Sequence, residues 1–138
     1  MRYLLDTHAL VWLITSKENQ LPESLIDSLT YYEDSFAVSE QSLIEIVQLQ
    51  QIGRLDANRP QKLRSTVEDS GIDIIPIDTD ILEAFYDLPM PTINRKRHSD
   101  PFDRVIIATA LRRGMTLVSR DEKFPWYRDH CRLRLLTV

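Results

Sequence analysis

Short apolar runs alternate along this chain with longer stretches whose apolar residues recur at helical spacing. The runs are four or five residues long, which suits buried strands, at residues 2–5, 35–38, 73–77, 115–119 and 134–138. Helices are expected at residues 7–14, from Pro22 through Leu25, Ile26 and Leu29, at about 39–52, at 60–70, from Asp78 to Leu88, and from Asp100 to Arg113. This alternation predicts an α/β fold: a short parallel β-sheet of four to five strands with helices on both faces.

Proline and glycine mark several ends of these elements. Pro101 suits the first position of a helix, and Gly71 and Gly114 each follow a predicted helix. Pro76 cannot donate a ladder hydrogen bond, so the third strand should end there or lie at an edge of the sheet. Residues 90–99 are predicted to be a polar loop.

Composition indicates an ordinary globular chain of 138 residues, expected to form a single domain over residues 1–138. The only cysteine, Cys131, excludes an internal disulfide and a cysteine-based zinc site, which favours a reducing cytoplasm. Asp6 and His8 interrupt the apolar N-terminal run, so a signal peptide is not expected, and no segment approaches the roughly 20 apolar residues of a membrane span. The net charge of −4 does not by itself indicate a nucleic-acid partner.

Four acidic residues stand where a carboxylate is costly. Asp6 ends an apolar run, Glu45 interrupts another, Asp103 opens a third, and Asp121 follows a predicted strand. Buried carboxylates require compensation, and no run of Lys or Arg matches all four. A hard divalent cation with oxygen ligands would compensate several together, which points to metal-dependent chemistry on a negative substrate such as a phosphodiester. Asp6 and Asp121 follow strands, at the sheet edge where such folds bind ligands.

Taken singly, three of these acids have simpler explanations. Asp6 suits an N-cap, Asp121 suits a turn, and Asp103 suits the first turn of a helix that Asp100 caps. Glu45 is harder to explain, because Leu49 and Ile52 continue its helical column. A glutamate in that column is salt-bridged, at an interface, or a metal ligand.

Four motifs resemble the PIN-domain family, and most of all its branch of VapC-type toxins from bacterial toxin–antitoxin pairs. They are Asp6-Thr7-His8-Ala9-Leu10-Val11-Trp12, Ser42-Leu43-Ile44-Glu45-Ile46, His98-Ser99-Asp100-Pro101-Phe102-Asp103-Arg104 and Ser119-Arg120-Asp121. The resemblance runs nearly from end to end, and the segment from His98 to Arg104 is its most specific part.

The resemblance implies a PIN-like fold and an endoribonuclease that depends on Mg²⁺ or Mn²⁺. The family's catalytic and metal-binding acids correspond to Asp6, Glu45, Asp103 and Asp121, with Thr7, Asp100 and Ser119 as supporting residues. The chemistry agrees, since carboxylates can hold cations that activate water and stabilise charge on a phosphate. The resemblance also implies an RNA substrate, a cognate antitoxin protein, a homodimer and no membrane.

Basic residues before and within the last long predicted helix are candidates for RNA contacts. They are Arg95, Lys96, Arg97, His98 and Arg104. Such side chains would hold phosphates with salt-dependent affinity. The simpler interpretation of the run is a solvated loop. His8 and the aromatic residues Trp12, Trp126 and Tyr127 are expected to pack rather than to catalyse or to stack on bases.

Four other functions stand beside the toxin, and the last three are disfavoured. The first is a PIN-type nuclease that matures RNA without a toxin role, although the small single-domain build favours the toxin. A receiver-like regulatory module or a haloacid-dehalogenase-like phosphatase would also gather aspartates at strand ends, but the former expects an acidic pair at the first strand and the latter an Asp at His8. A binding module without activity is disfavoured by four costly carboxylates.

Overall fold

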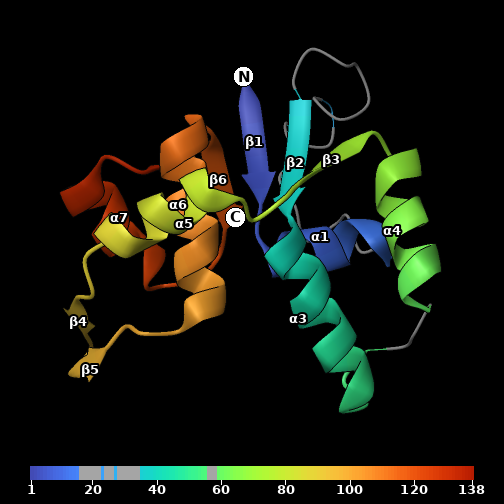
Figure 1. Cartoon of the computed structure of the whole chain (residues 1–138), viewed down its shortest axis with the longest axis horizontal. Helices are drawn as coiled ribbons and strands as arrows, with labels where there is room; N and C mark the ends of the chain where they lie inside the picture. Colours follow the sequence, from blue (N-terminus) through green and yellow to red (C-terminus); the bar gives the residue numbers. More distant parts are fainter. Residues whose placement is uncertain (16–22, 24–26, 28–34, 56–58) are drawn as a thin grey trace.

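The computed structural model of the chain describes residues 1–15, 23, 27, 35–55 and 59–138. Its centre is a five-stranded, wholly parallel sheet (Figure 1) in the order β3-β2-β1-β6-β7. The strands are β1 (Arg2–Leu5), β2 (Ser35–Ser39), β3 (Ile72–Ile75), β6 (Thr116–Ser119) and β7 (Arg134–Thr137). The predicted α/β fold with a short parallel sheet is therefore confirmed, at the upper end of the expected number of strands.

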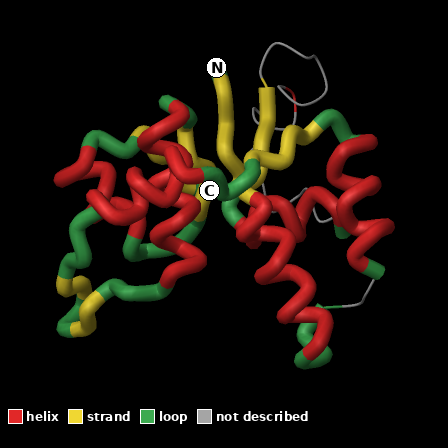
Figure 2. The backbone as a smooth tube through the Cα atoms, in the orientation of Figure 1, coloured by secondary structure: helices red, strands yellow, loops and turns green. Residues whose placement is uncertain are grey.

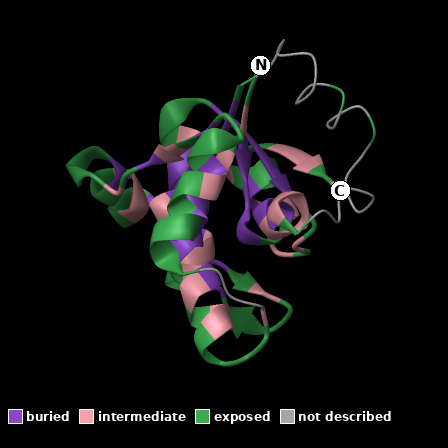
Figure 3. Cartoon of the chain, turned by 90° about the vertical axis from the view of Figure 1, so that its right-hand side faces the viewer, coloured by how far each residue is buried: buried purple, intermediate pink, exposed green. Residues whose placement is uncertain are grey.

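Alternate residues of the strands enter two separate cores, one on each face of the sheet. Leu5, Val38 and Val118 pack on one face, whereas their neighbours Leu4 and Leu117 pack on the other. The central strands are the most buried, and they lie between helices whose outer faces are exposed (Figure 3). Burial on both faces explains why the strands appear in the sequence as continuous apolar runs rather than alternating ones.

Helices cover both faces of the sheet, in two groups on opposite sides of the strands (Figure 2). One group is α1 (Thr7–Ile14), α3 (Glu40–Gln51) and α4 (Pro60–Asp69). The other is α5 (Thr79–Asp87), α6 (Pro101–Arg113) and α7 (Phe124–Cys131). Asp6, Ser39, Asp78 and Asp100 accept hydrogen bonds as N-caps, and Gly114 ends α6 in the left-handed region.

Two expectations about the second half of the chain were wrong. Residues 90–99 are not simply a loop, because β4 (Thr92–Ile93) and β5 (Lys96–Arg97) form a short antiparallel hairpin. Asn94 and Arg95 take φ angles of 52° and 66° at its turn, as a two-residue hairpin with the twist of its strands requires. Helix α7 was not predicted at all, because its sequence is rich in polar residues. Only Phe124 and Tyr127 are buried in it, which gives too weak an apolar pattern to recognise.

The third strand ends at Ile75, before Pro76, and lies at an edge of the sheet, so both expectations for that proline hold. The helix expected from Pro22, with Leu25, Ile26 and Leu29, falls outside the described residues. Within the described part, no helix is long and apolar enough to cross a membrane.

The strand order places a ligand position between β1 and β6. The chain winds from β1 outward through β2 and β3, then returns to β6 on the other side of β1 and continues to β7. In parallel sheets the connections on either side of such a reversal diverge and leave a crevice at the carboxyl ends of the strands. Asp6 directly follows β1, and Asp121 lies two residues after β6.

Candidate active site

Asp6 joins the sheet to the first helix. Its backbone N–H continues the ladder by donating to the Val118 carbonyl at 3.1 Å, and its side chain caps α1 by accepting from Ala9 N at 2.8 Å. The residue is only 6% exposed. The cap interpretation and the position at the sheet edge therefore both hold, and one carboxylate oxygen remains beyond the cap.

Asp121 approaches Asp6 from the neighbouring strand. The buried Ser119 hydroxyl accepts from Asp121 N at 3.0 Å and is also hydrogen-bonded to the Asp6 carboxylate. Asp6 and Asp121 line one pocket of about 200 Å³ together with His8, Trp12 and Arg120. Ser119 thus links the two acids by hydrogen bonds.

Glu45 reaches this edge from helix α3. The buried Thr7 hydroxyl donates to Glu45 Oε2 at 2.6 Å and is also 3.1 Å from Ser42 Oγ. This places Glu45 beside the residue that follows Asp6. The sequence argument for Glu45 was nevertheless wrong in part, because Ile52, which continues its column, is 59% exposed.

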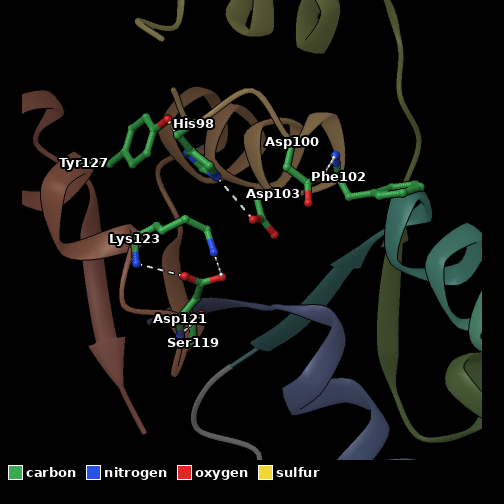
Figure 4. A network of polar contacts seen from close by, with 8 residues as sticks. All are labelled: His98, Asp100, Phe102, Asp103, Ser119, Asp121, Lys123 and Tyr127. Atoms are coloured by element: carbon green, nitrogen blue, oxygen red, sulfur yellow. Dashed lines mark hydrogen bonds and ion pairs between the residues drawn. The ribbon is translucent and has the colours of Figure 1, made fainter. Parts of the chain in front are cut away.

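Asp103 lies in the first turn of α6 and faces the same region. Its carboxylate is 3.3 Å from His98 Nε2, and His98 Nδ1 is 2.7 Å from the Tyr127 hydroxyl (Figure 4). Asp100, four positions from Arg104, is exposed and uses its side chain to cap the helix at Phe102 N, 2.9 Å away. Asp100 is therefore a cap, one of its two expected roles.

The acids influence one another electrostatically. Burial raises the pKa of Asp103 to about 6, with the charges of Asp100 and Asp121 adding to the rise and the His98 hydrogen bond opposing it. Burial also raises the pKa of Asp6, opposed by the Ser119 and Ala9 hydrogen bonds, with a smaller upward contribution from Asp121. The negative charge of Asp121 therefore contributes to the raised pKa of both Asp6 and Asp103.

Lys123 partly compensates this negative charge. Its ammonium is 3.1 Å from Asp121 Oδ2, and its backbone N–H donates to Asp121 Oδ1 at 2.8 Å (Figure 4). Burial alone would lower the pKa of Lys123, but Asp121, Asp103 and Asp100 together raise it. One ammonium faces several carboxylates, so the described site has an excess of negative charge.

The donor set has the chemistry of a hard-cation site. All four acids supply carboxylate oxygens, the ligand type that Mg²⁺ and Mn²⁺ prefer. Within the described residues, no three Asp, Glu, His or Cys side chains are already grouped closely enough to hold one ion. Burial raises the pKa values of Asp6 and Asp103, so a positive charge beside them would favour their ionised forms.

Two of the expected RNA-contacting residues are buried and serve the fold instead. Arg104 is 5% exposed; its guanidinium donates to the carbonyls of Leu88 at 3.0 Å and Pro89 at 3.4 Å and lies 4.9 Å from the centre of the Phe85 ring. His98 is 4% exposed, with both ring nitrogens engaged as described above. The burial of both side chains and the bonds that they already make argue against the predicted direct contact with RNA.

Other residues differ from their expected places or were missed. His8 is exposed at the mouth of the small pocket rather than packed. Trp12 lies under Arg120, whose guanidinium carbon is 4.7 Å from the ring centre, while Tyr127 is fully buried as expected. Sequence reasoning missed Lys123, although its position two residues after Asp121 is the spacing at which an aspartate turn forms.

Comparison with known proteins identifies the family. The model of the PIN domain matches residues 3–128. A search of the curated proteins gives no significant match.

Solved structures share the fold over nearly the whole chain. A chain of VapBC2 from Rickettsia felis bound to a promoter DNA fragment gives a TM-score of 0.68 at 22% identity, covering 99% of this chain and 98% of that one. DNA-bound VapBC from Salmonella typhimurium gives 0.66 at 18%, and VapBC-5 from Mycobacterium tuberculosis gives 0.59 at 18%, each with the same coverage of 99% and 98%. From the match over most of its length, this chain belongs to the PIN domain family.

Proposed function

We propose that this protein is an endoribonuclease that requires Mg²⁺ or Mn²⁺ and acts as the toxin of a toxin–antitoxin pair. The observation that carries the proposal is the meeting of Asp6 and Asp121 at the reversal of strand order, with Ser119 between them. Glu45 joins them through Thr7, and Asp103 joins through its electrostatic interaction with Asp121.

The four acids share one part in this proposal, and two hydroxyl residues support them. Asp6, Glu45, Asp103 and Asp121 would hold the ion. When bound, a divalent cation supplies a nucleophilic water and stabilises the charge that develops on the phosphate. Thr7 and Ser119 keep Glu45 and Asp6 in position by hydrogen bonds, which supports precise ligand placement.

The proposed partners are RNA, a cognate antitoxin and a second copy of the chain, in the cytoplasm. The solved structures that share the fold support the antitoxin, because they are VapBC complexes and one is described as a member of a family of toxin–antitoxin systems. Arrest of growth on expression, relieved by co-expression of a small protein encoded beside it, tests the toxin role. Growth that continues unchanged would favour a nuclease of RNA maturation.

Incubation of the purified protein with total RNA, followed by mapping of cleavage ends, tests the chemistry. Mg²⁺ or Mn²⁺ should support cleavage, EDTA should abolish it, and added ion should restore it. The matched variants are Asp103→Asn, which should be inactive, and Asp129→Asn on the exposed face of α7, which should cleave normally. Cleavage that persists in EDTA, or in Asp103→Asn, would refute the proposal.

A further inference from the structure

A positively lined pocket lies beside the acidic site. Its volume is about 520 Å³, within the range of ligand-binding clefts. Lys96 and Arg97 of the β4–β5 hairpin form part of its wall, and Arg120 and Lys123 from the turn after β6 form another part. Four cations therefore gather around one hollow, against two acids in its lining, Asp121 and Glu122, in a chain whose net charge is −4.

This cationic pocket adjoins the small pocket at Asp6. Arg120 and Asp121 line both of them. Lys123 marks the boundary, since it lines the cationic pocket while its ammonium binds the Asp121 carboxylate at 3.1 Å. A ligand in the larger pocket would therefore extend directly to the carboxylates, passing from positive to negative surroundings.

The fold holds the walls in place. Arg120 Nε donates to the Val138 carbonyl at 2.9 Å, which fixes the guanidinium between the two pockets. His98 follows the hairpin, and its backbone N–H donates to the Pro91 carbonyl at 2.7 Å while its ring is bound to Asp103 and Tyr127. The hairpin is thus attached to the same helix that presents Asp103.

From this arrangement, we infer that the cationic pocket binds the sugar–phosphate backbone of single-stranded RNA on one side of the bond that the acidic site cleaves. The inference rests on the proposed ribonuclease function and adds to it a binding site and its residues. Several separate cations along one hollow suit a ligand with a charge on every unit, and single strands are held by positive grooves that follow their backbone. The cations also offset the repulsion between such a ligand and the acidic site.

Some residues of the basic hairpin line the pocket and others do not, and this difference can be tested. Lys96 and Arg97 line it, whereas Arg95, at the tip of the hairpin with a φ of 66°, does not. Arg95→Asn therefore removes one hairpin charge outside the pocket, and asparagine tolerates this backbone conformation. Arg59 and Lys62, both exposed on or next to α4, provide a control that removes the same two charges far from the hairpin (Figure 1).

The experiment measures binding of single-stranded RNA oligonucleotides of mixed sequence to the full chain in EDTA, over a range of salt concentrations. Lys96→Ala/Arg97→Ala should bind about tenfold more weakly at 0.15 M salt. The slope of log affinity against log salt should fall by about 1.4, from about 0.7 for each lost phosphate contact. Arg95→Asn and Arg59→Ala/Lys62→Ala should each keep affinity within about twofold, as expected for exposed charges that make no phosphate contact.

Unchanged affinity and slope in the Lys96/Arg97 variant would overturn the inference, as would an equal loss in the Arg59/Lys62 control. Weakened binding of the antitoxin with unchanged binding of RNA would also overturn it, since the pocket would then be a protein contact. If the Lys96→Ala/Arg97→Ala variant has a lower melting temperature than the wild type, the test is repeated with Lys96→Gln/Arg97→Gln. Because binding is measured without metal, failure here leaves ion-dependent cleavage, and thus the proposed function, intact.

Discussion

At the scale of single residues, Asp6 has two roles that a substitution can separate. One carboxylate oxygen caps α1 by accepting from Ala9 N at 2.8 Å. In the proposed function, the negative charge of the same carboxylate helps to hold the metal ion. Asn keeps the cap, because it is among the best N-capping residues, whereas Ala removes it.

We therefore expect Asp6→Asn and Asp6→Ala to lose ribonuclease activity alike but to differ in stability. Asp6→Ala should unfold about 1 kcal/mol more easily than Asp6→Asn in urea, the usual cost of a lost N-cap. Asp6→Asn should be at least as stable as the metal-free wild type, since it relieves repulsion from Asp121. An active Asp6→Asn protein would show that this residue is only a cap.

Thr7 supplies a second test at this scale, because its hydroxyl holds Glu45 Oε2 at 2.6 Å. Thr7→Val keeps the shape but not the donor, and should reduce cleavage by roughly 10- to 100-fold, as residues that orient metal ligands usually do. Thr7→Ser keeps the hydroxyl and should retain most of the activity. Equal activity of the Val and Ser variants, measured as initial cleavage rates, would remove Thr7 from the site.

At the scale of elements, Arg104 fixes the segment between α5 and α6. It is buried in α6 and donates to the carbonyls of Leu88 and Pro89, which follow α5. Replacing Arg104 with an apolar residue would leave these two carbonyls without a hydrogen-bond donor, which is costly for buried polar groups.

Arg104→Met should accordingly lower the free energy of unfolding by about 2 kcal/mol, as expected for hydrogen bonds to a charged group. The control is Arg112→Met on the same helix, where an exposed arginine pairs with Asp80 at 3.2 Å and the loss should stay below about 1 kcal/mol. Urea denaturation of both variants gives the comparison. A stable Arg104→Met protein that binds RNA poorly would restore the role in RNA contact.

At the scale of the whole molecule, the acidic edge makes the stability of the fold depend on pH and on cations. The pKa of Asp103 is about 6 in the folded chain, against an ordinary value of 3.8 for an aspartate. Between these values the folded state binds more protons than the unfolded state, so stability falls as pH rises through about 6. Asp6, whose pKa is also raised, contributes with the same sign.

Without metal, the melting temperature of the wild type should therefore fall more between pH 5 and pH 7.5 than that of Asp103→Asn. At pH 7.5, Mg²⁺ should raise the melting temperature of the wild type, because a ligand of the folded state stabilises it, and should raise that of Asp103→Asn much less. Thermal melts at both pH values, with and without Mg²⁺, provide the measurement. Parallel pH curves for the two proteins would contradict the assigned shift.

The amino-acid sequence by itself determined the order and type of most elements and the identity of the four acids. Continuous apolar runs specify strands buried on both faces, and caps such as Asp78 and Asp100 specify helix starts. Asp6 and Asp121 could be assigned to one edge because parallel strands bring their carboxyl ends together. These features are local, or follow from one rule of topology.

Only the tertiary structure decided which side chains meet and which are buried. The contact of Thr7 with Glu45 joins residues 38 positions apart, and the pocket between the hairpin and the β6 turn joins segments that no local pattern relates. The burial of Arg104 is a further example, because a charged side chain is expected at the surface. Burial depends on which surfaces pack together, and periodicity within one segment carries no record of its distant partners.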